Sequence, residues 1–195
     1  MPKVLGISGS PRIQGNSHIL LKKALEGVRS QGWETQEMVL NELTFVPCQE
    51  EEYEQVDESG LSVIQDDMQK VYAQVEESSA VIISSPIFFG TLSAQTKMMI
   101  DRFQCVWISK YKGKSSMFTQ PKPGGFICVE ASQREDFLKN AQSIIKNFFK
   151  TINLRYVHEL LLKGIDKKAE VRNHPEYLSG AYQMGIRMTS GLPSK

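Results

Sequence analysis

Short runs of hydrophobic residues alternate along the chain with longer segments in which hydrophobic positions recur every three or four residues. The short runs predict buried strands at residues 4–7, 35–40, 80–83, 125–129 and 156–162. The longer segments predict amphipathic helices at about residues 16–29, 61–75, 92–103, 137–152 and 175–188. Strand and helix therefore alternate, and no internal repeat interrupts the order.

The strand segments are mostly continuous hydrophobic runs, which indicates burial on both faces of a parallel sheet. The segment 35–40 is interrupted by Gln36 and Glu37, so we expect it at a sheet edge. Right-handed crossovers then favour a three-layer arrangement with helices on both faces. We predict an α/β protein with a doubly wound five-stranded parallel sheet in the order 2-1-3-4-5, in a single domain spanning residues 1–195.

Composition narrows the class of protein. The chain has 195 residues, of which 41% are hydrophobic and 23% are charged, as is usual for a folded domain. A formal net charge of +1 argues against a partner that is a nucleic acid or a membrane surface. No hydrophobic stretch has the length of a membrane span or a signal peptide. The three cysteines form no CxxC pair, so we expect a reduced, cytoplasmic protein without a metal site.

The loop between the first strand and the first helix carries groups that bind phosphate. It offers the hydroxyls of Ser8, Ser10 and Ser17, the guanidinium of Arg12 and the amide of Asn16. It also ends at a helix N-terminus, where unpaired N–H groups and the helix dipole favour an anion. The loop matches neither a Walker A loop nor GxGxxG. Glycine, serine and asparagine also form ordinary turns, which is the alternative interpretation.

A second loop follows the third strand, and the sheet order places it beside the first. Pro86, Ile87, Phe88 and Phe89 offer hydrophobic contact to a planar ring, and Gly90 allows close approach of the backbone. Core packing is the alternative for one of the two phenylalanines. The first loop therefore predicts a phosphate site, and the second loop would place a hydrophobic surface beside it.

Two sequence blocks carry a family resemblance. Ser8-Gly9-Ser10-Pro11-Arg12 is followed by Gly15-Asn16-Ser17, and Ser85 to Gly90 is followed by Ser93-Ala94-Gln95-x-Lys97 and Ile100-Asp101-Arg102. Both blocks resemble the NADPH-dependent FMN reductase family, which has the flavodoxin-like fold and includes the iron–sulfur flavoproteins.

The resemblance implies a cofactor and its contacts. Ser10, Arg12, Asn16 and Ser17 would hold the 5′-phosphate of FMN. Backbone N–H groups of residues 86–90 would face the N5 and O4 edge of the isoalloxazine. Residues 130–133 after the fourth strand, among them Ala131 and Ser132, would approach its pyrimidine side.

The sequence departs from the iron–sulfur branch in the loop after the second strand. That branch carries a compact cysteine cluster there, whereas residues 48–58 hold one cysteine, Cys48, and six acidic residues. Because a cluster of this kind needs four thiolates, the chain resembles a cluster-less relative. Phe88 also stands where members of the branch often have tyrosine.

The function implied is that of an FMN-dependent oxidoreductase. NAD(P)H would give a hydride to flavin N5, and the electrons would pass to a small acceptor such as a quinone, a nitro or azo compound, a metal oxyanion or free flavin. We name no acid–base residue, because the cofactor supplies the redox chemistry. The resemblance also suggests a homodimer or homotetramer. We expect the flavin near a subunit interface, with residues between Lys110 and Lys122 closing over it, because this lysine-rich segment is the only long connection near the third strand.

Two alternatives remain open from the sequence. One is a flavodoxin-like electron-transfer protein, which near-zero net charge disfavours because such carriers usually steer their partners by a strong field of one sign. The other is a phosphate-binding domain without flavin.

Overall fold

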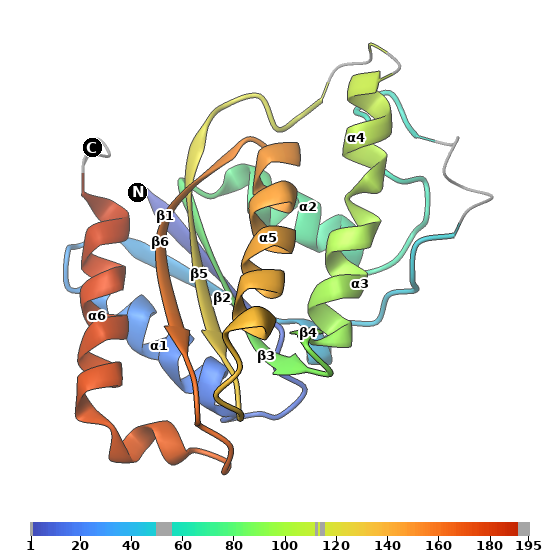
Figure 1. Ribbon diagram of the computed structural model, residues 1–195. Coiled ribbons are helices and arrows are strands. Elements are labelled where there is room, and N and C mark those ends of the chain that lie inside the picture. Colours follow the sequence, from blue (N-terminus) through green and yellow to red (C-terminus); the bar gives the residue numbers. More distant parts are fainter. Residues whose placement is uncertain (1, 50–55, 112, 114–115, 191–195) are drawn as a thin grey trace.

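Five parallel strands form the centre of the computed structural model, which describes residues 2–49, 56–111, 113 and 116–190 (Figure 1). They are β1 (Lys3–Ser8), β2 (Glu34–Val39), β3 (Ala80–Phe88), β5 (Lys122–Val129) and β6 (Leu154–Leu162). Their order is β2-β1-β3-β5-β6, and all neighbouring pairs are parallel. This confirms the predicted order and the edge position of the second strand. A further short strand, β4 (Thr91–Leu92), pairs antiparallel with the end of β3.

Helices cover both faces of the sheet (Figure 1). On one face, α1 (Asn16–Arg29) and α6 (Pro175–Thr189) enclose a hydrophobic core with Val4, Ile82 and Ile127. On the other face, α2 (Met68–Glu77), α3 (Ala94–Arg102), α4 (Gln104–Tyr111) and α5 (Glu135–Thr151) enclose a second core. Two 3-10 turns, η1 (Leu40–Glu42) and η3 (Glu170–Asn173), complete the elements. The molecule is thus the three-layer doubly wound structure that the alternating pattern predicts.

Two helices differ from the predicted ones. The helix expected over residues 61–75 begins only at Met68, because the Asp66 carboxylate accepts the Met68 N–H (3.0 Å) and also binds the buried Arg102 guanidinium (2.5 Å). Leu61 is buried in the irregular segment before the helix. Its hydrophobic side chain therefore extends the three- and four-residue spacing of α2 without being part of the helix. Helix α4 was not among the predicted helices.

The contact between α1 and α6 is unusually close. A Cβ atom built on Gly185 would lie 1.8 Å from the carbonyl oxygen of Ala24, and one on Gly27 would lie 2.1 Å from that of Tyr182. Each helix therefore presents a glycine to the backbone of the other. This contact fixes α1, whose N-terminus faces the first loop.

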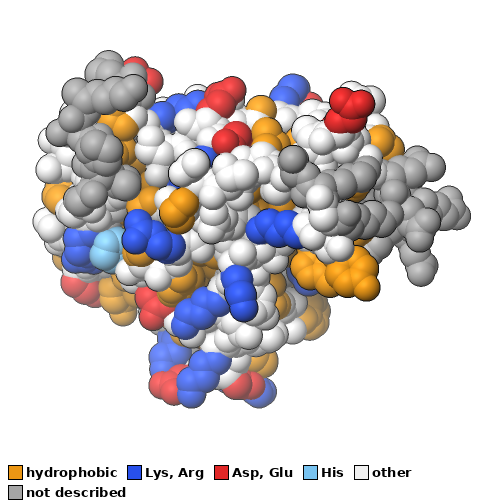
Figure 2. Space-filling model, turned by 90° about the horizontal axis from the view of Figure 1, so that it is seen from above, with side chains coloured by type: hydrophobic (Ala, Val, Ile, Leu, Met, Phe, Trp, Pro, Cys, Tyr) orange, Lys and Arg blue, Asp and Glu red, His pale blue; other side chains and the backbone are white. Residues whose placement is uncertain are grey.

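Within the single chain, the described part of the lysine-rich segment 110–122 lies at the opposite edge of the sheet from the carboxyl ends of the strands, so its closure over a flavin at a subunit interface stays a prediction. This part leads into the amino end of β5, where Lys122 Nζ donates to the carbonyl of Val75 at 3.3 Å. That end is uppermost in Figure 1 and faces the viewer in Figure 2, which shows Lys and Arg side chains interspersed with Asp and Glu. A crossover between parallel strands must return the chain to the amino end of the next strand. Residues 112, 114 and 115, like residues 50–55 of the acidic loop, lie outside the described residues.

None of the described helices combines the length and the hydrophobicity that a membrane span requires.

Candidate functional site

The β1–α1 loop (residues 9–15) and the end of β3 meet at the carboxyl edge of the sheet. The backbone N–H of Gly9 donates to the Ser84 carbonyl at 2.8 Å, and the Ser93 hydroxyl donates to the Gly9 carbonyl at 2.6 Å. The Ser93 hydroxyl also accepts the Thr96 N–H and so caps the N-terminus of α3. These bonds fix the two loops as the walls of one pocket, at the switch point where doubly wound proteins bind ligands.

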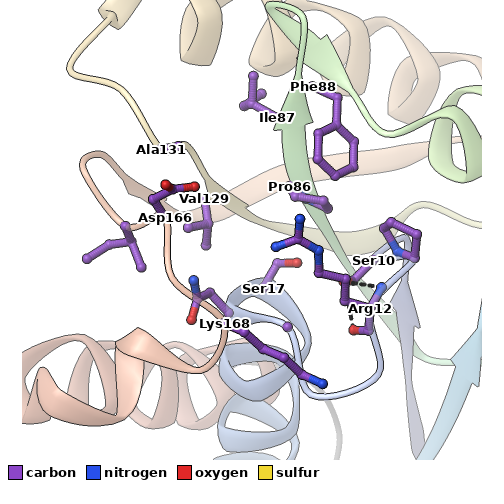
Figure 3. Close-up of a pocket in the computed structure, with 14 residues that line it drawn as sticks. Ser10, Arg12, Ser17, Pro86, Ile87, Phe88, Val129, Ala131, Asp166 and Lys168 are labelled. Carbon is purple, nitrogen blue, oxygen red and sulfur yellow. Dashed lines mark hydrogen bonds between the residues drawn. The ribbon is translucent and has the colours of Figure 1, made fainter.

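Fourteen residues from four segments line this pocket (Figure 3). They are Ser10, Pro11, Arg12, Gly15, Asn16, Ser17, Pro86, Ile87, Phe88, Val129, Ala131, Ile165, Asp166 and Lys168.

The floor of the pocket is the N-terminus of α1, and its geometry suits an anion. The helix has no side-chain cap hydrogen bond and no acidic residue in its first turn. The Ser17 hydroxyl is 1% exposed and has no hydrogen-bond partner among the described residues. The buried hydroxyl and the free N–H groups of the helix are hydrogen-bond donors that lack an acceptor in the described part of the chain. Phosphate oxygens would supply that acceptor.

Two cationic side chains border the same space. In Figure 3 the guanidinium of Arg12 extends from the β1–α1 loop toward Pro86 and the Ser17 hydroxyl, and the Lys168 side chain crosses the first turn of α1 toward the loop. Across the described part of the chain, no carboxylate lies within ion-pair distance of either cation. Asp166 is the acidic residue in the lining. The cations are therefore available to a negatively charged ligand.

Ser10 and Asn16 line the pocket, but their side chains already hold the protein together. The Ser10 hydroxyl donates to the Arg12 carbonyl (2.9 Å) and accepts the Arg12 N–H (3.2 Å). The Asn16 amide donates to the Lys167 carbonyl (2.9 Å), and its oxygen accepts the Val171 N–H (3.2 Å). Asn16 thus ties the pocket floor to the segment after β6, so a phosphate would meet its backbone N–H rather than its amide.

A hydrophobic wall stands opposite the floor. Pro86, Ile87 and Phe88 line it, and the Phe88 ring points into the pocket (Figure 3). Phe89 and Gly90 do not line it but form the turn between β3 and β4, with φ angles of 49° and 79°. Phe89 is fully exposed and Phe88 is 39% exposed, so the expectation that one of them packs in the core is wrong.

Two further predicted residues lie outside the lining. Ser8 is buried at the end of β1. The Ser132 hydroxyl donates to the Glu130 carboxylate and accepts the Arg134 N–H at 3.2 Å, so it stabilises its own turn. Its neighbour Ala131 does line the pocket.

The segment after β6 also lines the pocket, although the sequence pattern did not predict this. Ile165, Asp166 and Lys168 reach the pocket because the Ile165 N–H donates to the Glu130 carbonyl (3.1 Å) and the Gly164 N–H donates to the Ser132 carbonyl (3.0 Å). No local sequence motif predicts that these residues reach the pocket. The available signal was topological, since β6 lies beside β5 and the segment after it must emerge at the same edge.

The sheet order defines a flavodoxin-like protein, and its pocket has the N-terminus of α1 as its floor and a hydrophobic wall opposite. Residues 2–158 match the family model described as NADPH-dependent FMN reductase, and the chain belongs to this family. It is 32% identical over 162 residues to an iron–sulfur flavoprotein of Methanocaldococcus jannaschii, covering 83% of this chain and 76% of the relative.

Solved structures share the fold. An NAD(P)H:quinone oxidoreductase from Methanothermobacter marburgensis superposes with a TM-score of 0.76 at 17% identity, covering 99% of this chain and 98% of that one. A flavone reductase superposes with a TM-score of 0.72 at 18% identity. The superposition covers 95% of this chain but only 61% of the reductase chain.

The cysteines present do not fit an iron–sulfur cluster of the kind in the relative's name. Such clusters are usually held by four thiolates, and this chain has three cysteines. Two of them are buried in separate elements, Cys105 in α4 and Cys128 in β5. Burial raises the pKa of both thiols, which disfavours the thiolate form that a metal needs.

Proposed function

We propose that this protein is an FMN-dependent oxidoreductase in which NAD(P)H is the electron donor and a small molecule is the acceptor. FMN would bind in the pocket between the β1–α1 loop, the end of β3 and the segment after β6. The proposal takes the described fold as part of one FMN-binding domain over residues 1–195. The observation that carries it is the buried Ser17 hydroxyl, which has no hydrogen-bond partner among the described residues and lies at a helix N-terminus that none of their side chains caps, opposite a hydrophobic wall.

The proposed binding divides the ligand between two kinds of surface. The helix N–H groups, the Ser17 hydroxyl and the cations Arg12 and Lys168 would hold the 5′-phosphate. Pro86, Ile87 and Phe88 would contact the flat ring, whose hydrophobic area is poorly hydrated in water. Ser10 and Asn16 would keep the loop in shape through the bonds described above.

Bound FMN would supply a two-electron carrier that takes a hydride from NAD(P)H and passes electrons to the acceptor. The protein contributes position and exposure. Phe88 is 39% exposed at the open side of the pocket, so a second planar molecule has access to that side. The acceptors we propose are quinones, nitro or azo compounds, metal oxyanions and free flavin. The family resemblance also supports a homodimer or homotetramer, which light scattering would test.

The test uses the purified protein freed of flavin. We expect one FMN to bind per chain, at least about tenfold more tightly than riboflavin, because only FMN has the phosphate. Anaerobic addition of NADPH or NADH should then bleach the flavin absorbance, and a quinone should restore it. Absence of FMN binding would refute the proposal. FMN binding without reaction with either nicotinamide would favour an electron-transfer protein instead.

A further inference from the structure

His18 lies directly under the β1–α1 loop, in the first turn of α1. It is 4% exposed, although histidine beside a loop is often solvated. Both ring nitrogens are engaged. Nδ1 accepts the backbone N–H of Gln14 at 3.4 Å, and Nε2 lies 2.5 Å from the Glu37 carboxylate on β2.

These two contacts define the tautomer of the ring. An imidazole nitrogen that accepts an N–H bond carries no proton, so the proton of a neutral His18 lies on Nε2 and is donated to Glu37. This bond lowers the pKa of Glu37, which therefore remains an acceptor. The carboxylate on the neighbouring strand thus keeps Nδ1 free to accept from the loop.

The residue that His18 holds has a strained backbone. Gln14 has a φ of 60°, in the left-handed region that non-glycine residues seldom adopt. It lies in the turn closed by the bond from the Gly15 N–H to the Arg12 carbonyl (2.9 Å). This turn places Arg12 on one side and the N-terminus of α1 on the other. Whatever keeps Gln14 in this conformation therefore also sets the distance between the cation and the helix N–H groups.

We propose that His18 is the positioning residue of the anion site: by accepting the Gln14 N–H it holds the turn that brings Arg12 and the α1 N-terminus to the same phosphate. Glu37 orients His18 from behind. This inference rests on the proposed function, because the anion is taken to be the 5′-phosphate of FMN. It assigns His18 no contact with the ligand and no proton transfer.

Two isosteric variants separate the contacts of the ring. In His18→Asn the amide oxygen can occupy the place of Nδ1 and accept from Gln14. In His18→Gln the amide reaches the place of Nε2 and can bind Glu37, but the Gln14 N–H loses its acceptor. We expect His18→Gln to bind FMN about 3- to 10-fold more weakly than the wild type, as loss of one hydrogen bond predicts. His18→Asn should bind FMN within about twofold of the wild type.

Riboflavin is the control ligand, because it contacts the ring site but has no phosphate. Its affinity should be the same in the wild type and in both variants. Lys22→Gln is the control variant, since Lys22 also lies within ion-pair distance of Glu37 (3.9 Å) and is more than half exposed. It should change neither flavin.

Fluorescence titrations of both flavins, with thermal unfolding of each variant, decide the matter. Equal weakening of FMN and riboflavin, or equal weakening by the Asn and Gln variants, would overturn the role of His18 and leave it a packing residue. A wild type that does not distinguish FMN from riboflavin would instead refute the proposed phosphate site.

Discussion

Arg12 is the residue whose substitution most directly tests the proposed phosphate site. It borders the pocket, and among the described residues no carboxylate competes for it. A charge-assisted bond to phosphate is usually strong enough that Arg12→Ala should weaken FMN binding about 10- to 150-fold. Arg12→Lys should recover only part of the loss, because an ammonium lacks the planar fork of a guanidinium.

Riboflavin titration again supplies the control for Arg12. Its affinity should change little in Arg12→Ala, since it has no phosphate to lose. If both flavins weaken alike, Arg12 acts by shaping the loop rather than by binding the anion.

Phe89 is a residue at which the fold and the sequence disagree. It is the first residue of a two-residue turn in which both φ angles are positive, a geometry that strongly prefers Asn-Gly. The side chain is fully exposed, so packing does not offset the backbone cost. Phe89→Asn should therefore raise the free energy of unfolding by about 1 kcal/mol, as chemical denaturation would measure.

Phe89→Leu is the matched control for that gain. It shortens the side chain but keeps an ordinary L-residue at the positive φ, so its stability should stay within about 0.5 kcal/mol of the wild type. If Phe89→Asn brings no gain, the turn is not strained as its angles indicate. A gain in stability with slower reduction of quinones would show that the exposed ring serves the reaction.

At the scale of the elements, the α1–α6 contact predicts opposite effects for two glycines of α6. Gly185 touches the backbone of Ala24, so Gly185→Ala forces the helices apart and should destabilise the protein by about 1–3 kcal/mol. At Gly180 a new Cβ would meet only Leu160 Cδ1, at 3.6 Å. Gly180→Ala should stabilise by up to about 1 kcal/mol through helix propensity.

Urea unfolding of the two alanine variants measures this difference. Equal changes in the two would mean that propensity alone determines the outcome and that the helices separate at little cost. A larger loss in Gly185→Ala, with weaker FMN binding, would show that α1 moves with the contact.

Most of these helices and strands could be predicted from the sequence. Hydrophobic residues recur every three or four positions in the helices and form continuous runs in the buried strands. The continuous runs in β1, β3 and β5 and the stripes on α1 and α5 are local signals. The prediction failed over residues 61–67, where long-range bonds override a helical spacing. The Asp66 carboxylate binds Arg102, 36 residues away, and that pairing is invisible in a local pattern.

The site was predictable to the same extent and for the same reason. Ser17, Arg12 and Pro86 belong to two short contiguous segments at the ends of β1 and β3, so their residue types and positions indicate a ligand. Lys168 joins them only through folding of the distant segment after β6. The engagement of the Asn16 amide with Lys167 and Val171 likewise depends on contacts more than 150 residues apart in sequence.

At the scale of the whole molecule, the match to the family model ends within β6, before η3 and α6. It covers residues 2–158, whereas Lys168 lines the pocket and α6 covers one face of the sheet. A chain cut after His158 would end within β6 and would lose the buried residues Ala181, Met184 and Met188 of α6 from the core that α1 shares. We expect it to lack a cooperative unfolding transition and to bind no FMN.

Circular dichroism and thermal unfolding of the cut chain beside the full chain would test this. A cut chain that melts cooperatively near the temperature of the full chain would show that α6 is an accessory to the fold.

The glycine contact between α1 and α6 has a consequence for how members of this family can exchange parts. A hydrophobic helix face can pack against many partner helices. A contact between two backbones requires a glycine at the position where the helices touch. A C-terminal helix taken from a relative without a glycine opposite Ala24 would displace α1 even if every hydrophobic position matched. The segments that form α1 and α6 therefore have to be exchanged together, although most of the chain lies between them.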